Sequence, residues 1–220
     1  MASRKYDAAM STPLRLGTLV SGGGRTVVNL ADRIADGTLP AEIGLVIASR
    51  ADLVAVDRAR SRGLDVRIAD RRDFDTDDAL HDAITAWLTE CGVGLVCLCG
   101  YLRWFRIDEP FRGRAMNIHP ALLPDFGGDG MYGHHVHEAV LASGNKVSGC
   151  TVHFIDEQYD HGPIILQRSC PVRPDDDADT LAARVFEQEC LAYPEAIHLF
   201  AAGRLRLAGD RVEIVPAAGE

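Results

Sequence analysis

The stretch that decides the fold is LRLGTLVSGGGRTVVNLADRIA, residues 14–35. Its first seven residues form an apolar run that is typical of a buried strand. Residues 21–24 then supply a glycine-rich turn, and residues 25–35 carry apolar side chains at helical spacing. A strand, a tight turn and a helix in this order predict the first half of a βαβ unit.

Strand-like and helical patterns keep alternating along the next part of the chain. We expect strands over residues 43–48, 66–69 and 93–99, and helices over residues 51–62 and 75–90. This alternation predicts an α/β fold, a doubly wound, mostly parallel sheet with helices on both faces. Ligands of such sheets bind outside the carboxyl ends of the strands, which is where the glycine-rich turn lies.

The second half of the chain changes character. In order, the pattern predicts strands over residues 150–155 and 164–172, a loop over 156–163 between them, a helix over 179–201 and a hairpin over 204–215. No internal repeat or linker divides the chain, so residues 14–220 are expected to form a single domain. The polar residues 1–13 lack an apolar signal core and are interpreted as a disordered extension.

Composition limits the kind of partner. The chain is 47% hydrophobic and 25% charged, and it has no apolar run near the roughly 20 residues of a membrane span, so we expect a cytoplasmic protein without a membrane partner. A net charge of −9 argues against nucleic acid as a partner, because phosphate backbones need clustered Lys and Arg. The six cysteines contain no CxxC pair and are interpreted as free thiols. Whether the chain is a monomer or a homodimer stays open.

The glycine-rich turn favours a small anionic ligand. Glycines let backbone amides approach a ligand, and a helix N-terminus adds partial positive charge, so a phosphate monoester fits at Gly24, Arg25 and Thr26. The pattern is neither a Walker A loop nor a full dinucleotide fingerprint, because Val27 stands at the third glycine position. A plain strand-to-helix turn without a ligand is the alternative reading of the turn taken alone.

Three polar residues in the second half suit proton transfer around a carbonyl group. Asn117 and His119 follow a short strand-like run, residues 114–116. Asp160 lies in the predicted loop over residues 156–163, two residues before Gly162. The amide and a protonated imidazole can donate hydrogen bonds to an oxyanion. We expect the carboxylate to raise the pKa of His119, so that the imidazole is charged near neutrality. Simple turn residues are the alternative for each one taken alone.

Five motifs in order extend this pattern to a family resemblance. They are LVSGGG (residues 19–24), CGYLR (99–103), NIHPALLP (117–124), GCTVHF (149–154) and DHGPIILQ (160–167). Together they resemble the phosphoribosylglycinamide formyltransferases, which belong to the folate-dependent formyltransferase superfamily. The resemblance implies the formyltransferase fold, 10-formyltetrahydrofolate as co-substrate, and direct formyl transfer to the amine of 5-phosphoribosylglycinamide in de novo purine (IMP) biosynthesis. Partners would then be these small molecules.

The resemblance also implies roles for individual residues. The catalytic residues would be Asn117, His119 and Asp160. The ribonucleotide would be bound by Gly24, Arg25, Thr26 and Glu189. The folate would contact Leu102, Arg103, Trp104, Phe105 and Asn117, together with backbone groups of the loop that begins at Asp156.

Several positions depart from the family pattern. Many members have Ser-Asn where this chain has Arg25-Thr26, and some have an arginine where it has Asp77. The stretch 126–133 is longer and richer in glycine than in the short members. The histidines within residues 134–137 lack zinc-site spacing, so no metal is expected, and the resemblance gives His135 and His137 a packing role in a loop.

Alternative functions remain in two classes. Within the superfamily the chain could be a formyltetrahydrofolate hydrolase or a formyltransferase acting on a nucleotide-linked amino sugar. The hydrolases normally carry an extra N-terminal domain, which residues 1–13 are too few to form. From another class, the strand–turn–helix alone would suit a nucleotide- or NAD-binding module, against which the missing third glycine counts.

Overall fold

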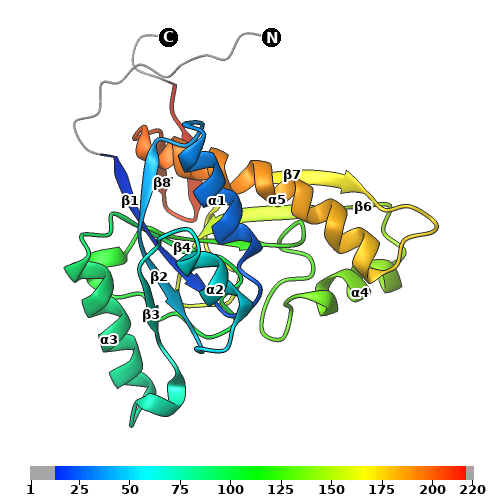
Figure 1. The fold of residues 1–220 in the computed structure, drawn as a ribbon. Coiled ribbons are helices and arrows are strands. Elements are labelled where there is room, and N and C mark those ends of the chain that lie inside the picture. The colour runs from blue at the N-terminus through cyan, green and yellow to red at the C-terminus, as the bar shows by residue number, and fades with distance from the viewer. Residues whose placement is uncertain (1–12, 217–220) are drawn as a thin grey trace.

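A computed structural model describes residues 13–216, and the predicted strand–turn–helix is its first unit. Strand β1 (Leu14–Val20) and helix α1 (Arg25–Ala35) have the predicted bounds. The other elements, in chain order, are β2 (Ala41–Ala48), α2 (Val54–Arg60), β3 (Val66–Ile68), η1 (Arg71–Asp73), α3 (Asp77–Glu90), β4 (Leu95–Leu98), η2 (Glu109–Phe111), β5 (Ala115–His119), α4 (His134–Ser143), β6 (Val147–Phe154), β7 (Ile164–Pro171), α5 (Ala178–Ala201), β8 (Leu205–Ala208) and β9 (Arg211–Ile214) (Figure 1). The extension predicted over residues 1–13 lies, except for Pro13, outside the described residues.

The main sheet has seven strands in the order β3-β2-β1-β4-β5-β6-β7. The five strands from β3 to β5 pair in parallel, whereas β6 pairs antiparallel with both β5 and β7, so β6 alone runs against the other six strands. The predicted doubly wound, mostly parallel sheet is therefore confirmed. The predicted C-terminal hairpin forms a separate two-stranded sheet of β8 and β9.

The sheet buries an apolar core on each face. Along β1, Leu16 and Val20 contribute to one core cluster and Leu19 to the other, because successive side chains of a strand point to opposite faces. Residues of α1, α2 and α5 belong to the first cluster, and residues of α3 belong to the second. Helices therefore cover both faces, as predicted.

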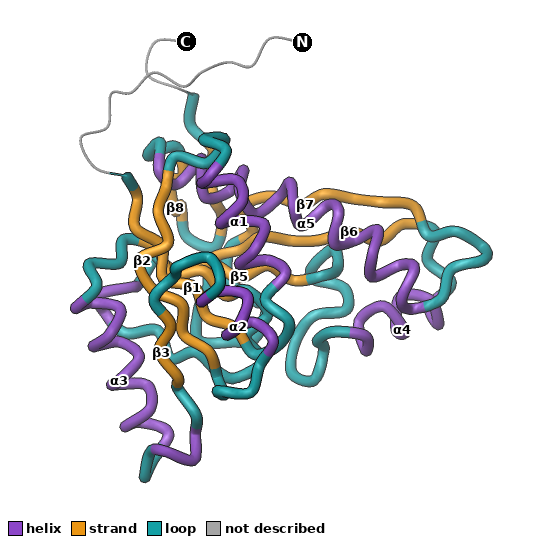
Figure 2. The backbone as a smooth tube through the Cα atoms, viewed as in Figure 1, coloured by secondary structure: helices purple, strands orange, loops and turns teal. Residues whose placement is uncertain are grey.

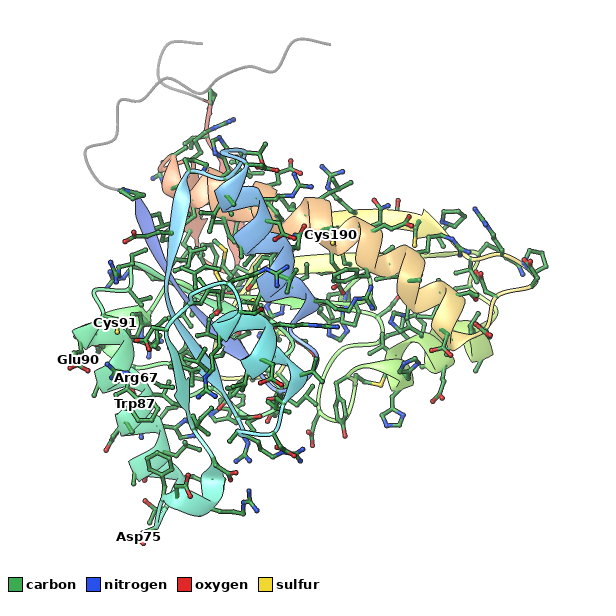
Figure 3. All side chains as sticks on the ribbon, in the orientation of Figure 1. Arg67, Asp75, Trp87, Glu90, Cys91 and Cys190 are labelled. Atoms are coloured by element: carbon green, nitrogen blue, oxygen red, sulfur yellow. The ribbon has the colours of Figure 1, made fainter. Side chains whose placement is uncertain are left out.

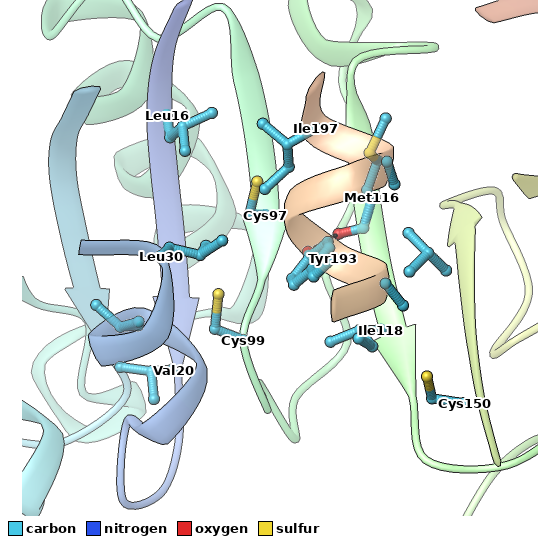
Figure 4. Packing of buried hydrophobic residues seen from close by; sticks show 14 of the residues in the cluster. Leu16, Val20, Leu30, Cys97, Cys99, Met116, Ile118, Cys150, Tyr193 and Ile197 are labelled. Carbon is cyan, nitrogen blue, oxygen red and sulfur yellow. Dashed lines mark hydrogen bonds between the residues drawn. The ribbon is translucent and has the colours of Figure 1, made fainter. Parts of the chain in front are cut away.

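A buried tyrosine fastens α5 to the centre of the sheet. The side chain of Tyr193 is fully buried, and its hydroxyl lies 3.0 Å from both the carbonyl oxygen of Leu98 and that of Met116. These acceptors belong to the neighbouring strands β4 and β5, and Figure 4 shows the ring between the two strands. Leu98 pairs with Asn117 in the sheet, so the contact lies directly behind a predicted catalytic residue.

At the β3 edge, the strand and α3 are joined by one basic side chain. Arg67 forms a 2.7 Å ion pair with Glu90, and its guanidinium carbon lies 5.7 Å from the centre of the Trp87 ring (Figure 3).

None of the helices in the described part of the chain is long and apolar enough to cross a membrane. The six cysteines are free thiols, as expected from their spacing.

The main difference from the predicted elements is helix α4. The sequence pattern indicated no helix between β5 and β6, and the resemblance placed His135 and His137 in a loop. Instead, both lie with His134 in the first turn of α4. The helix is short and lies between Gly133 and Gly144. Residues 127–133, which precede it, contain four glycines, and these conceal the helical spacing of the apolar residues that follow. Figure 2 shows the long irregular segment that leads from β5 into this helix.

Candidate active site

A cavity of about 440 Å³ opens where β1, β4 and β5 end. Its walls come from the glycine-rich turn after β1, the segment after β4, the end of β5, the loop before α4, the β6–β7 loop and α5. This is the edge at which an α/β sheet of this kind binds its ligands. The predicted phosphate turn and the predicted proton-transfer residues therefore share one cavity.

The structure brings the three predicted catalytic residues together in this cavity. Asn117 and His119 alternate on β5 and so face the same side, while the residues between and before them belong to the core. Asn117 Nδ2 donates a hydrogen bond of 3.1 Å to Asp160 Oδ1, and His119 Nδ1 lies 3.3 Å from Asp160 Oδ2. One carboxylate thus contacts both of the other groups.

A second histidine orients the amide of Asn117. His153 Nδ1 lies 2.8 Å from the Phe154 carbonyl oxygen, which can only accept, so Nδ1 carries the proton. His153 Nε2 is then an acceptor, and Asn117 Nδ2 donates to it at 3.2 Å. Both N–H bonds of the Asn117 amide are therefore used, one by His153 and one by Asp160.

The loop after β5 closes over the same groups. His119 Nε2 donates to the Phe126 carbonyl oxygen at 2.7 Å, and the Gly128 N–H donates to Asp160 Oδ2 at 3.1 Å. Phe126 and Asp160 both have left-handed backbones, with φ of 57° and 53°. A Cβ on Gly127 would lie 2.4 Å from the end of the Leu123 side chain and 3.2 Å from Asp160 Cβ, so the loop packs closely at this point.

The remaining motif residues hold this arrangement in place. Thr151 Oγ1 donates to the Ala121 carbonyl at 2.7 Å and accepts from the Leu123 N–H at 3.0 Å, which fixes the segment that follows His119. Gln167 Nε2 donates to the Leu123 carbonyl at 2.9 Å. A Cβ on Gly162 would lie 2.0 Å from the Phe154 carbonyl oxygen, so the Asp-x-Gly turn packs directly on β6.

The charge state of His119 differs from the prediction. Burial lowers the pKa of His119 below its ordinary value, and the attraction of the Asp160 carboxylate offsets this only in part. The prediction that Asp160 makes His119 a cation near neutrality is therefore wrong for this structure. Burial also acts to raise the pKa of Asp160, but its neighbours, among them His119 and the Gly128 N–H, outweigh it, and the net shift is downward. The pair is a neutral imidazole beside a carboxylate.

The predicted phosphate turn contributes two of its three residues to the cavity. Arg25 and Thr26 line it, whereas Gly24 does not. Gly24 precedes α1 with φ of 71°, and a Cβ there would lie 2.7 Å from that of Ala55, so its role is to let α2 approach the turn. Sequence reasoning did not identify Arg58 of α2, whose Nη1 donates to the Gly23 carbonyl at 2.7 Å.

Glu189 reaches the same end of the cavity from α5. It lines the cavity together with Arg25, whose guanidinium carbon lies 3.6 Å from the centre of the Phe186 ring. Burial raises the pKa of Glu189 to about 7, and the charge of Arg25 opposes this shift. The carboxyl group therefore changes its charge near neutral pH.

The predicted folate residues form the opposite wall, with one exception. Leu102, Arg103, Trp104 and Phe105 all line the cavity, and the Trp104 ring contacts that of Tyr159 at 4.9 Å between centroids. Asp156 does not line it, because its carboxylate accepts hydrogen bonds from the Gln158 N–H and from His161 Nδ1 at 2.8 and 2.7 Å.

Asp77 lies outside the main cavity, and the segment around the start of α4 contributes residues to it. Asp77 forms an ion pair with Arg71 and lines a neighbouring hollow of about 430 Å³, which also borders on Arg103 and Trp104. In the loop before α4 and in α4 itself, sequence reasoning overlooked several residues that line the main cavity. They are Met131, Tyr132, His134 and His137.

Comparison with known proteins assigns this fold to a family. Residues 14–197 match the family described as formyl transferase, so the chain belongs to the formyl transferase family. Within it, the similar curated proteins include two named phosphoribosylglycinamide formyltransferase. The Haemophilus influenzae protein is 34% identical over 195 residues, covering 88% of this chain and 90% of that protein. The chloroplastic protein of Arabidopsis thaliana is 35% identical over 216 residues, covering 96% and 74%.

Solved structures and longer relatives extend the comparison. Glycinamide ribonucleotide transformylase 1 from Symbiobacterium toebii superposes with a TM-score of 0.87 at 38% identity, covering 97% of this chain and all of that chain. A trifunctional purine biosynthetic protein of Drosophila pseudoobscura pseudoobscura is 37% identical over 196 residues, and the match spans 87% of this chain but only 14% of that protein. A formyltetrahydrofolate deformylase from Pseudomonas syringae, at 17% identity and a TM-score of 0.81, shares the fold.

Proposed function

We propose that this chain transfers the formyl group of 10-formyltetrahydrofolate to the primary amine of 5-phosphoribosylglycinamide. The observation that carries the proposal is the single cavity that joins Asn117, His119 and Asp160 to a glycine-rich turn bearing Arg25. A phosphorylated acceptor fits the turn, and the three polar residues lie where an amine bound there would meet a formyl group. The names and identities of the relatives support the same substrates.

The reaction forms one bond and breaks one. The amine nitrogen attacks the formyl carbon, the carbonyl electron pair moves to oxygen, and the tetrahedral intermediate collapses with loss of the folate nitrogen. One proton passes from the attacking nitrogen to the leaving nitrogen, so atoms and charge balance. No nucleophilic side chain is needed, which makes direct transfer the simplest route.

The His119–Asp160 pair suits the transfer of that proton. His119 Nε2 carries its hydrogen, since it donates to the Phe126 carbonyl, and so Nδ1 presents a lone pair to Asp160 Oδ2 at 3.3 Å. A proton released by the amine can be held between these two atoms. Because burial lowers the pKa of His119, the pair does not retain the proton and can pass it to the leaving nitrogen.

The binding roles follow from the same placement. Arg25 and Thr26 bind the phosphate beside the N-terminus of α1, and Glu189 contacts the ribonucleotide from α5. Trp104, Phe105 and Tyr159 enclose the folate ring. The folate acts as a co-substrate. Asp156 contributes through the backbone of its loop, because its carboxylate is occupied within the loop.

Formyl transfer measured with and without 5-phosphoribosylglycinamide tests the proposal. Acceptor-dependent release of tetrahydrofolate is expected from the wild-type chain and not from His119→Ala or Asp160→Asn. Release without acceptor would make the chain a hydrolase and contradict the proposal. Thermal stabilisation by NAD but not by a folate would also contradict it and would favour the nucleotide-binding alternative.

A further inference from the structure

A histidine of α4 is the most unusual group in the cavity that the proposed mechanism does not use. His137 is only 5% exposed and lines the cavity. Its Nδ1 is fully enclosed and has no hydrogen-bond partner among residues 13–216. Its Nε2 is not enclosed in this way, so the ring meets the cavity through its Nε2 edge. A buried polar ring with one unpartnered nitrogen requires an explanation.

The unpartnered nitrogen indicates which tautomer is present. A buried N–H without an acceptor forfeits a hydrogen bond that water would supply, and such donors are rarer in proteins than unshared acceptors. The proton of the neutral ring therefore belongs on Nε2, and the bare Nδ1 faces the apolar interior. Burial, together with His134 and His119, lowers the pKa of His137 to about 4, so the ring stays neutral at physiological pH. His137 thus presents a fixed N–H donor to the cavity.

The other donors near the reacting groups are already occupied. Asn117 gives its two N–H bonds to Asp160 and His153, and His119 Nε2 donates to the Phe126 carbonyl. Neither can reach a substrate oxygen until one of these contacts breaks. The Nε2–H of His137 needs no such rearrangement, because no residue of the described chain accepts it. His119 and His137 both line this cavity, so the two rings border the same space.

We propose that His137 is a further catalytic residue, whose Nε2–H donates a hydrogen bond to the formyl oxygen as that atom becomes an oxyanion. The step rests on the proposed function. The carbonyl electron pair moves to oxygen as the amine nitrogen bonds to carbon, and His137 keeps its proton throughout. A neutral imidazole is suited to this role because it stabilises the oxyanion without protonating the attacking amine.

Single-turnover formyl transfer with matched variants tests this role. His137→Phe keeps a ring of similar size without the donor, and we expect its rate to fall by about 100-fold or more, with KM for both substrates within about 3-fold of wild type. His137→Gln restores an N–H near the position of Nε2 and should retain a rate within about tenfold of wild type. His135→Gln is the control, because His135 lies on the same helix but is exposed and does not line the cavity.

The outcomes separate this inference from the proposed function. An unchanged rate in His137→Phe, or a loss confined to KM, overturns the inference while the wild-type transfer still stands. Equal losses in the Phe and Gln variants indicate packing and also overturn it. Absence of acceptor-dependent transfer in the wild-type chain overturns the proposed function itself. Nitrogen NMR of the wild-type ring gives a readout without turnover: a neutral Nε2–H tautomer between pH 6 and pH 8 is expected, and an Nδ1–H tautomer contradicts the inference.

Discussion

The imidazole of His119 faces the carboxylate of Asp160 with 3.3 Å between Nδ1 and Oδ2, and both side chains are at least nine-tenths buried. Burial and the neighbouring charge act on His119 in opposite directions, and burial has the larger effect. The site therefore holds its negative charge on the carboxylate and keeps the ring neutral. The pKa of His119 therefore reports how far burial, which lowers it, outweighs the charge of Asp160, which raises it.

His119 is expected to titrate below the ordinary pKa of a histidine. Replacing Asp160 by Asn removes the charge that stabilises the imidazolium, so the pKa of His119 should fall further in Asp160→Asn. The ring proton resonances of His119, followed by NMR across pH 4 to pH 8, measure both values. A pKa that rises in the variant would contradict this account of the pair.

Arg25→Ala is expected to weaken binding of the acceptor and leave the chemistry intact. A charge-assisted hydrogen bond to phosphate contributes about 1.5 to 3 kcal/mol, so KM for 5-phosphoribosylglycinamide should rise roughly 10- to 100-fold. The rate at saturating acceptor should change little, because Arg25 lies with Phe186 and Glu189 rather than with His119. Arg60→Ala, on the exposed face of α2, is the matched control.

Glu189 is expected to make stability depend on pH. Its pKa is raised from 4.5 to about 7 in the folded chain, so the folded state binds more protons than the unfolded state between these values. Stability is then lost as pH rises through this window. Glu189→Gln should remove the loss and become more stable than wild type at pH 8 by roughly 1 to 3 kcal/mol, with little difference at pH 4.5. Urea unfolding at several pH values without ligand measures the difference, and a gap that does not grow with pH would contradict it.

Gly162→Ala is expected to damage both stability and activity. The added Cβ would lie 2.0 Å from the Phe154 carbonyl oxygen, and that backbone atom can move only with β6. The loss should be about 2 kcal/mol or more, in the range of severe core overpacking. Gly22→Ala is the control for stability, because nothing lies within 4 Å of a Cβ at that position. Equal melting temperatures for the two variants would show that the turn before β7 can move.

Tyr193→Phe is expected to destabilise the fold without removing a cavity residue. The two buried carbonyls of Leu98 and Met116 lose their shared donor, which should cost about 1 to 3 kcal/mol. Tyr132→Phe is the matched control, because Tyr132 is 46% exposed and should shift stability by no more than about 0.5 kcal/mol. Denaturant unfolding of both variants provides the comparison.

Local pattern and strand-end geometry predicted much of this structure. The bounds of β1 and α1 follow from alternation and helical spacing, which act over a few residues. The convergence of Asn117 and His119 with the phosphate turn follows because parallel strands end at one edge of the sheet. Asp160 was singled out for its chemistry together with Asn117 and His119, but its contact with them depends on the loop between β6 and β7.

What the sequence concealed depends on contacts between distant segments. The pKa of His119 is governed by burial under the loop at Phe126, and no local pattern reports that burial. The resemblance placed His137 in a loop, and the glycines before the short helix α4 hide its helical pattern, although its spacing of three from His134 places both on one helix face. Asp156 was placed correctly in its loop, but its carboxylate accepts hydrogen bonds from Gln158 and His161 of the same loop.

Strand β5 lies where the parallel strands meet the reversed strand β6, and the cavity draws its residues from both sides of it. The turn after β1, on the parallel side, is proposed to bind the acceptor phosphate. Strand β5 carries Asn117 and His119, and the loop between β6 and β7 carries Asp160. On the proposed function, a substitution at Arg25 therefore changes acceptor binding while Asn117 and His119 keep their places. The choice of acceptor and the formyl chemistry then depend on different strand ends and can be altered separately.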